Sequence, residues 1–292
     1  MKIIGIDIGG TEIKGALFDK VILKESKRKT KQDLGKEAIM LNLIELIKDL
    51  WVEEVKAIGI VTAGAVDIER GIITNNVGTL KGWVNFCIKE EVELIFKVPC
   101  FIENDANGAL IAEVEGYQNI ENACMITLGT GVGTAAYING KLYRGQNYKI
   151  EFGHSILIPN GRECTCKKKG CAESYLSGNA LKKTAIEEVD AKIKHGKELF
   201  ELYQLGNKSA EKVIDDYTDL LALFIHNICM FYDPQLIIIG GGLICQKDIL
   251  FEFLSGKTKD LDALVVPAKL GNFAGVKGAY LIASNGMKNG KD

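Results

Sequence analysis

Two stretches of this chain follow the same plan of a strand, a glycine-rich turn and a returning strand. The first covers residues 2–19 with the turn DIGGT at 7–11, and the second covers residues 123–140 with the turn LGTGVG at 128–133. Both begin with a short apolar run typical of a buried strand. Because a pattern that recurs at long spacing indicates a duplicated architecture, the chain is predicted to form two related α/β lobes.

The rest of the chain alternates helical and strand patterns, as expected for an α/β protein. Further elements are predicted at 35–50 (helix), 57–64 (strand), 86–96 (helix), 100–105 (strand), from 106 (helix), 178–230 (helices), 236–242 (strand and turn) and at the C-terminus (helix). The N-terminal lobe is predicted at 1–118, with a C-terminal helix at 279–292 as a candidate addition. The C-terminal lobe is predicted at 119–278 and carries a zinc-binding loop.

The charge of the chain is nearly balanced. Its 292 residues include 36 Lys and Arg against 38 Asp and Glu. No global field therefore recruits nucleic acid or a membrane surface, so small molecules are the expected partners. The N-terminal run MKIIGIDIGG lacks the features of a signal peptide, and the protein is expected to be cytoplasmic, where thiols stay reduced.

A third glycine turn, GGG at 240–242, follows the apolar run QLIII. Glycines let backbone N–H groups approach phosphate oxygens, although an ordinary hairpin turn explains any one of the three turns. Three turns at strand ends together predict a nucleotide in the cleft between the lobes. Asp7, at the end of the first strand, is a candidate to hold Mg²⁺ through water.

The segment FIENDANGA places Asn104 and Asp105 between a short buried strand and a helix. Two interpretations of Asp105 are open at this point. It is the N-cap of the helix, a common role for Asp, or it is a general base that takes a proton from an attacking hydroxyl.

Three cysteines lie within eight positions, and His154 precedes them by ten. Cys164, Cys166 and Cys171 with His154 form a Cys₃His set suited to tetrahedral zinc, and four protein ligands make such a site structural. A reducing compartment favours this over a disulfide. Two further expectations concern the remaining cysteines and histidines. The five other cysteines are expected in the core, as is His226, and His195 is expected on an exposed helix face.

In this order, the motifs resemble those of the ROK family of sugar kinases and repressors, which belongs to the actin-like ATPase superfamily. The resemblance spans nearly the whole chain. It rests on DIGGTEIKGALFD, TAGAVD, ENDANGA, LGTGVG, EFGH, CTCKKKGCAE and LIIIGGG.

The resemblance implies a two-lobed actin-like ATPase fold and an enzyme that transfers the ATP γ-phosphoryl group to a hexose or N-acetyl hexosamine, usually at the 6-hydroxyl. Asp105 is then the general base, and His154 contacts both zinc and sugar. The implied sugar-binding residues are Gly64, Asn104, Asp105, Glu151, His154 and Glu173. The implied nucleotide-binding residues are Asp7, Gly9, Gly10, Thr11, Gly129, Thr130, Gly131 and Gly241. ATP, Mg²⁺ and a structural Zn²⁺ are the implied cofactors, and a homodimer is the implied assembly.

Three positions depart from the family pattern. Lys167 stands where the cysteine motif usually has Gly, Ala63 stands where Pro often precedes the pocket glycine, and Thr79 occupies the position of a frequent Asn. The preferred sugar is therefore left open. Two alternative functions are a sugar-sensing regulator without catalysis and an actin-like ATPase without sugar chemistry.

Overall fold

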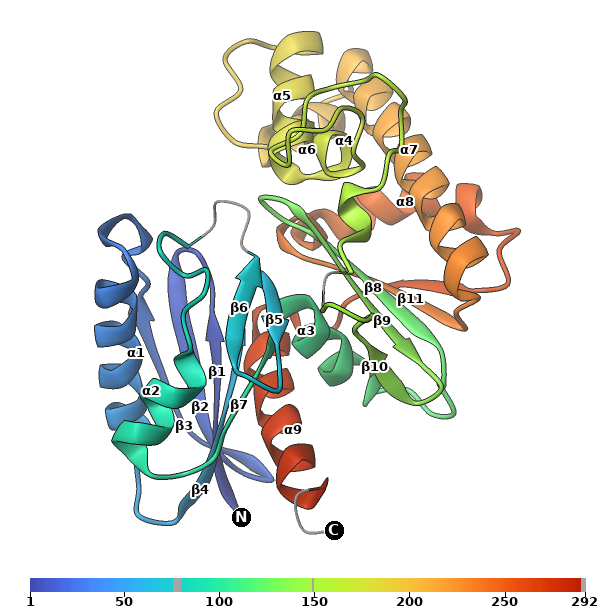
Figure 1. Ribbon diagram of the computed structural model, residues 1–292. Coiled ribbons are helices and arrows are strands. Elements are labelled where there is room, and N and C mark those ends of the chain that lie inside the picture. The colour runs from blue at the N-terminus through green and yellow to red at the C-terminus, as the bar shows by residue number, and fades with distance from the viewer. Residues whose placement is uncertain (76–79, 149, 290–292) are drawn as a thin grey trace. The chain divides into compact units, whose positions relative to one another are not determined.

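The computed structural model describes residues 1–75, 80–148 and 150–289. Its helices and strands fall into two compact units (Figure 1). Unit 1 comprises Met1–Gly116, Arg144–Ile150 and Asn272–Asp292, and unit 2 comprises Tyr117–Tyr143 and Glu151–Gly271. The C-terminal helix is thus part of unit 1, and the chain returns briefly to unit 1 after Tyr143.

Unit 1 is built on a sheet whose described strands have the order β3-β2-β1-β4-β7. The strands of unit 1 are β1 (Lys2–Ile8), β2 (Glu12–Asp19), β3 (Val21–Lys29), β4 (Val55–Thr62), β5 (Ala65–Asp67), β6 (Ile72–Asn75) and β7 (Cys100–Asn104). Its helices are α1 (Lys36–Leu50), α2 (Ile88–Phe96), α3 (Asp105–Val114) and α9 (Ala274–Asn289). Strands β5 and β6 pair as a separate antiparallel hairpin.

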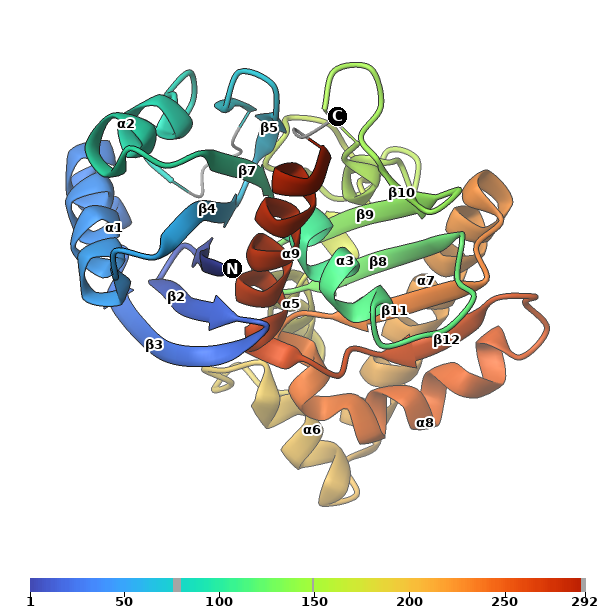
Figure 2. The same cartoon turned by 90° about the horizontal axis from the view of Figure 1, so that it is seen from below.

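Helices cover both faces of this sheet, which explains why β1 and β4 are almost continuously apolar. On one face, Leu46 and Leu50 of α1 pack against Gly15. On the other, α9 runs so close to the sheet that a Cβ on Gly5 or Gly59 would overlap its backbone. Figure 2 shows α9 lying along β1 and β4, with α3 beside it. The carboxyl ends of β1, β4 and β7 therefore reach one edge of the sheet, where the predicted site residues of unit 1 lie.

Unit 2 has a second sheet, in which the described strands have the order β10-β9-β8-β11-β12. Its strands are β8 (Ala123–Leu128), β9 (Val132–Ile138), β10 (Lys141–Tyr143), β11 (Leu236–Gly240) and β12 (Leu264–Pro267). Its helices are α4 (Glu173–Leu176), α5 (Gly178–Glu188), α6 (Lys197–Gln204), α7 (Lys208–Tyr232) and α8 (Lys247–Thr258), with the short 3₁₀ helices η2 (Phe152–His154) and η3 (Gly242–Gln246). The buried side chains of β8, β11, α7 and α8 form one hydrophobic core.

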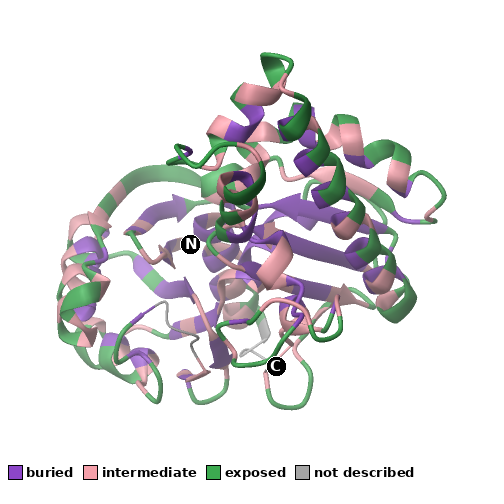
Figure 3. Ribbon diagram, turned by 90° about the horizontal axis from the view of Figure 1, so that it is seen from above, coloured by how far each residue is buried: buried purple, intermediate pink, exposed green. Residues whose placement is uncertain are grey.

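The two sheets share one topology, which confirms the predicted duplication. In each, three antiparallel strands are followed by two parallel strands on the side of the first strand: β1-β2-β3 with β4 and β7, and β8-β9-β10 with β11 and β12. Figure 3 shows that many residues of the strands are buried. The two-unit α/β architecture is that of the actin-like ATPases, as predicted.

The sequence analysis did not predict the β5-β6 hairpin, strand β10, helix α4, helix α8 or strand β12. The hairpin is only three and four residues per strand, too short for a clear alternation of polar and apolar residues. In the part of the chain that the structure describes, no helix has both the length and the apolar character needed to cross a membrane.

Candidate functional site

Asn104 and Asp105 lie where β7 ends and α3 begins. Asn104 is the N-cap of α3, because its Oδ1 accepts hydrogen bonds from the backbone N–H groups of Ala106 (2.9 Å) and Asn107 (3.1 Å). Asp105 is the first residue of the helix, and its Oδ1 accepts from the Ala106 N–H at 2.8 Å. The N-cap interpretation of Asp105 was therefore wrong. The neighbouring Asn already fills that role, and Asp105 is left partly exposed.

Gly64 is held next to this turn. The Asn104 Nδ2 donates to the Gly64 carbonyl oxygen at 2.9 Å. Gly64 has φ 103°, a conformation that favours glycine, and a Cβ there would overlap the Asn75 carbonyl oxygen. The structure thus brings Gly64, Asn104 and Asp105 together at one edge of unit 1, although they lie forty positions apart in sequence.

Asp7 faces the same edge from the end of β1. Burial, with the charge of Asp105 nearby, raises the pKa of Asp7 to about 7. Burial also raises the pKa of Asp105 to about 6, against the backbone hydrogen bond from Ala106, which lowers it. Gly275 in the first turn of α9 packs against the Asp7 carboxylate, where a side chain would overlap it. Two carboxyl groups that change protonation near neutral pH therefore lie close together, as is common at catalytic sites.

The turn between β1 and β2 is fixed by its own backbone and by Thr30. The Gly9 N–H donates to the Glu12 carbonyl oxygen at 3.0 Å, and the Thr30 Oγ1 donates to the Gly9 carbonyl oxygen at 2.6 Å. The Thr30 N–H donates to the Thr11 carbonyl oxygen at 2.9 Å, while the Thr11 side chain is exposed. Gly10 lies at the tip of this turn, half-buried.

The two glycine turns of unit 2 meet because β8 and β11 are neighbouring parallel strands. Gly241 has φ 88°, and a Cβ on it would lie 2.5 Å from the backbone nitrogen and oxygen of Leu128. In the other turn, the Gly129 N–H donates to the Gly131 carbonyl oxygen at 3.0 Å, and the exposed Thr130 lies between them. The Gly178 N–H, at the start of α5, donates to the Gly129 carbonyl oxygen at 2.7 Å.

Glu173 connects the β8-β9 turn with the cysteine-rich loop. Its Oε2 accepts from the Val132 N–H at 3.1 Å, and its Oε1 accepts from the Thr165 Oγ1 at 3.1 Å. A Cβ on Gly131 would overlap the Glu173 carboxylate, so this glycine leaves room for it.

Glu151 directly precedes η2, and His154 is the last residue of η2, which packs on β9. A Cβ on Gly153 would overlap the Val132 carbonyl oxygen, so this turn packs directly on the start of β9. The His154 N–H donates to the Glu151 carbonyl oxygen at 2.9 Å. Glu173 and Gly153, the residue before His154, thus both contact Val132, although they lie 20 positions apart in sequence.

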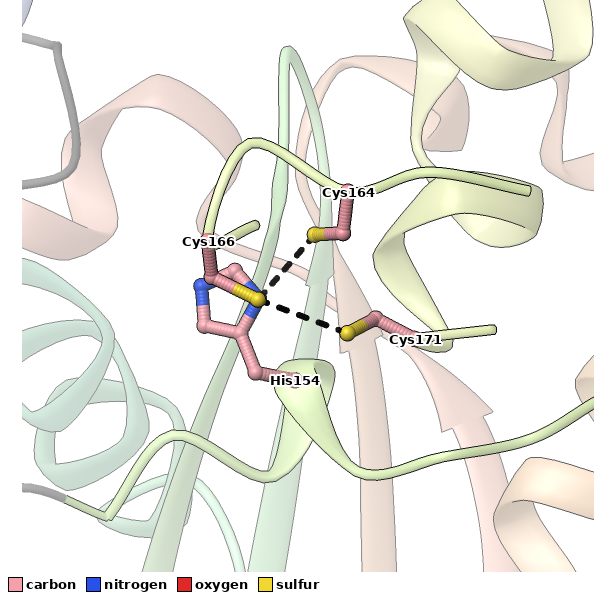
Figure 4. Close-up of side chains that lie close together, drawn as sticks. All are labelled: His154, Cys164, Cys166 and Cys171. Carbon is pink, nitrogen blue, oxygen red and sulfur yellow. Dashed lines mark hydrogen bonds between the residues drawn. The ribbon is translucent and has the colours of Figure 1, made fainter. Parts of the chain in front are cut away.

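The predicted zinc ligands converge (Figure 4). The ligand atoms of His154, Cys164, Cys166 and Cys171 all lie within 4.8 Å of one another. The Cys164 Sγ lies 3.5 Å from the His154 Nδ1, and the Sγ atoms of Cys166 and Cys171 are 3.5 Å apart. A tetrahedral zinc ion with Zn–S bonds of about 2.3 Å sets its ligands roughly 3.5–3.8 Å apart, so these residues fit the metal.

Cys171 of this set ionises less readily than a free thiol. Burial, with Cys166 and Cys164 beside it, raises the pKa of Cys171 to about 12. A thiolate therefore forms at Cys171 when a positive charge compensates it, which a zinc ion does.

Lys167 makes the turn that the family usually makes with Gly. It has φ 67°, in the left-handed region, and its N–H donates to the Cys164 carbonyl oxygen at 2.9 Å. A side chain in this conformation costs on the order of 1 kcal/mol. The loop keeps the turn despite this strain, and the Lys167 side chain is exposed.

Several expectations for the other cysteines and histidines were wrong. Cys100, Cys124 and Cys229 are buried as expected, but Cys87 is half-buried and Cys245 is exposed. His226 is exposed on α7, so it is not a core residue. It occupies the outer face of that helix, a position that short-range periodicity did not resolve.

His195 is exposed as expected, but it precedes α6 instead of lying within a helix. Thr79, one of the three departures from the family pattern, lies outside the described residues.

The sequence did not reveal the partner of Glu103, the residue before Asn104. Glu103 is 1% exposed, and the Arg144 Nε donates to it at 2.6 Å. The two residues are 41 positions apart, and nothing in the sequence pattern links them. A charged residue inside the apolar strand CFIEN was the one available indication, because buried carboxylates need partners.

Comparison with known proteins identifies relatives over nearly the full chain. The ROK family matches residues 3–285. The glucokinase of Streptomyces coelicolor is 31% identical over 310 residues, which cover 96% of each chain. The N-acetylmannosamine kinase of Vibrio vulnificus is 32% identical over 83% of each chain.

Solved structures show the same fold. A ROK family glucokinase from Streptomyces griseus, crystallised with glucose and AMPPNP, aligns with a TM-score of 0.84 at 28% identity, covering 98% of this chain and 100% of that one. A ROK hexokinase from Thermus thermophilus aligns with a TM-score of 0.85 at 29% identity, covering 99% and 100%. With its duplicated α/β units, its three glycine turns and its Cys₃His loop, this chain belongs to the ROK family.

Proposed function

We propose that this protein is an ATP-dependent kinase of a hexose or N-acetyl hexosamine and that it phosphorylates the 6-hydroxyl group. The observation that carries the proposal is Asp105, a partly exposed carboxylate at the start of α3 whose pKa is raised to about 6. A base with a pKa slightly below the working pH is mostly deprotonated and still accepts a proton readily.

In the proposed reaction, Asp105 takes the proton of the sugar hydroxyl as its oxygen attacks the γ-phosphorus of ATP. The bond to the β,γ-bridging oxygen breaks, so that ADP leaves and a sugar phosphate forms. Phosphoryl transfer of this kind depends mainly on positioning and on charge stabilisation. Asn104 and Gly64 fix the turn that aims Asp105, through the contact between the Asn104 Nδ2 and the Gly64 carbonyl oxygen.

The remaining sugar hydroxyls are assigned to Glu151, His154 and Glu173. Two contacts of Val132 support this assignment, because its N–H donates to the Glu173 carboxylate and its carbonyl oxygen packs against Gly153, in the 3₁₀ helix that follows Glu151 and ends at His154. The His154 Nδ1 faces the Cys164 Sγ, which leaves Nε2 as the nitrogen for a sugar hydroxyl.

The ATP phosphates are assigned to the glycine turns, that is, to Gly9, Gly10, Thr11, Gly129, Thr130, Gly131 and Gly241. The exposed hydroxyls of Thr11 and Thr130 and the contact of Gly241 with Leu128 support this assignment. Asp7 is assigned to Mg²⁺ through water. A bound Mg²⁺ ion would offset phosphate charge at this edge and favour the ionised form of Asp7.

His154, Cys164, Cys166 and Cys171 would hold zinc, which supplies a structural crosslink. The loop that carries Thr165, and through it one oxygen of Glu173, would then be fixed.

The curated relatives support a sugar substrate without choosing among sugars, because relatives named glucokinase and N-acetylmannosamine kinase have nearly the same identity to this chain. A single hydrogen bond in a sugar pocket can separate such substrates by large factors. The homodimer stays a prediction.

The test is a coupled assay of ADP release over a panel of hexoses and N-acetyl hexosamines, with the wild type and Asp105→Asn. The variant should lose kcat by about 10²–10⁴-fold, the usual contribution of a general base, and should still bind the sugar in calorimetry. Asp33→Asn, an exposed position in unit 1, is the matched control and should retain full activity. Near-normal turnover of Asp105→Asn would exclude Asp105 as the base.

A further inference from the structure

Glu103 is a charged residue in an apolar place. It lies in β7 directly before Asn104, and it is only 1% exposed. An ionised carboxylate costs several kcal/mol to bury unless it is paired and hydrogen-bonded. The partners of Glu103 must therefore explain how its carboxylate is tolerated at this buried position.

Each oxygen of Glu103 has a partner. Oε2 accepts from the Arg144 Nε at 2.6 Å. Oε1 accepts from the Asn104 N–H and from the Asn107 Nδ2, both at 2.9 Å. The last two donors lie on either side of Asp105, so one carboxylate oxygen spans the turn that carries it.

We propose that Glu103 and Arg144 form a buried brace that holds the β7-α3 turn and thereby fixes the direction of Asp105. This inference rests on the proposed function, in which Asp105 is the base. Glu103 and Arg144 are positioning residues in this account, because the buried carboxylate is occupied on both oxygens and cannot contact a substrate.

Charge balance explains why the brace needs Arg144. Asp7 and Asp105 already place two carboxyl groups at this edge, and the charge of Asp105 acts on Asp7. A third, unpaired carboxylate at residue 103 would add to the same field. The Arg144 guanidinium offsets that charge at short range, and hydrogen bonds between charged partners are about twice as strong as neutral ones.

The brace also joins two distant parts of unit 1. Arg144 follows β10 and is the first residue of the short stretch, beginning at 144, that returns to unit 1 between two parts of unit 2. Loss of the guanidinium would leave the Glu103 Oε2 buried without its charged partner. The Glu103 side chain would then shift toward water, and this shift would disturb the hydrogen bonds of its Oε1 with the Asn104 N–H and the Asn107 side chain.

The test compares Arg144→Gln, Glu103→Gln and the double variant with the matched control Arg28→Gln. Arg28 pairs with Asp49 at 2.8 Å in unit 1, through the same kind of guanidinium contact, and has no part in the site. Moving a catalytic group by about 1 Å can lower the rate ~10²-fold. Arg144→Gln should therefore lower kcat about 10–100-fold and change the sugar KM less than about threefold. The neutral pair of the double variant should recover part of that kcat, as expected for coupled residues.

Amide hydrogen exchange of peptides that span residues 104–110 gives a second readout, which does not depend on activity. Exchange should be faster in Arg144→Gln than in the wild type and unchanged in Arg28→Gln. Unchanged exchange in Arg144→Gln would show that the pair does not hold the turn, which overturns the proposal. Faster exchange with an unchanged kcat would also overturn it, because the pair would then stabilise the turn without directing Asp105. If the wild type phosphorylates no sugar of the panel, the proposed function fails, and the exchange measurement still decides whether the brace holds the turn.

Discussion

At the scale of single residues, we expect the ionisation of Asp105 to affect both the proposed activity and the stability of the fold. Burial keeps a proton on this residue up to a pH of about 6, whereas an Asp in an unfolded chain loses its proton near pH 3.8. The same burial that makes Asp105 a good proton acceptor therefore makes its charged form costly to the fold. Strained or costly residues of this kind are typical of functional sites.

The pH dependence of the reaction follows from this. Because the base acts only when it is deprotonated, kcat/KM should fall as the pH is lowered through about 6, the pKa of Asp105. A profile of kcat/KM between pH 5 and 8, recorded with saturating Mg·ATP, would check it. A rate that stays constant down to pH 5 would contradict the assignment.

The stability should move in the opposite sense. The folded state binds the proton of Asp105 more tightly than the unfolded state does, so this residue lowers the free energy of unfolding as the pH rises from about 4 to about 6. Asp105→Asn removes this titration. Thermal unfolding without Mg²⁺ should therefore show the variant gaining stability over the wild type across that window, with a constant difference above it.

At the scale of elements, the Cys₃His loop and the β8-β9 turn form one assembly through Glu173. The carboxylate accepts from Thr165 in the loop and from Val132 at the start of β9. The loop itself contains a left-handed Lys167 that costs energy. A metal bound at the Cys₃His set would offset this strain and give the loop a fixed shape, so that a short irregular segment could hold a site residue in place.

Removing a ligand of the metal should test this arrangement. We expect about one zinc ion per chain in the wild type and a loss of zinc in Cys171→Ser, measured by atomic emission. The melting temperature of this variant should fall by more than about 4 °C, because metal binding contributes folding free energy. Cys245→Ser, at an exposed cysteine outside the cluster, should keep both the metal and the melting temperature. Full zinc content in Cys171→Ser would contradict the ligand set.

At the scale of the whole molecule, the chain builds the same sheet twice and then returns to the first unit with α9. At several contacts of this helix with the sheet and with α3, at least one of the two residues is a glycine, so the backbones lie close together. A Cβ on Gly59 would overlap Ala279, and a Cβ on Gly278 would overlap the Gly108 carbonyl oxygen of α3. Helix α3 begins at Asp105, and Gly275 of α9 packs against the Asp7 carboxylate. The close approach of α9 therefore helps to position both Asp7 and the helix that carries Asp105.

Adding one methyl group at this contact should destabilise unit 1. Gly278→Ala forces α9 away from α3 and should cost about 1–3 kcal/mol, the usual penalty of overpacking, in urea unfolding. Gly256→Ala is the matched control, because Gly256 lies in α8 with no atom near the position of a Cβ. It should stabilise the protein by roughly 0.5–1 kcal/mol through helix propensity. An unchanged midpoint for Gly278→Ala would show that α9 can shift freely.

Local patterns in the sequence were sufficient for the main elements and for the four residues of the Cys₃His cluster. The apolar runs of β1, β4, β8 and β11, the glycine turns between strands and the spacing of His154 to Cys171 each lie within a few tens of residues. The duplicated topology was predictable because the strand, turn and strand pattern occurs twice. The hairpin β5-β6 was missed because its strands are too short to show a period.

The site itself needed contacts between distant residues. By itself, the sequence determined the type of fold, the glycine turns and the members of the Cys₃His cluster, because periodicity, turn chemistry and ligand spacing are local properties. Only the tertiary structure decided that Asn104 caps α3 and leaves Asp105 partly exposed, that Glu103 pairs with Arg144, and that Glu173 is held by Val132 and Thr165. Hydrogen bonds and pKa shifts depend on which groups are buried side by side, and that is set by the packing of segments far apart in the chain.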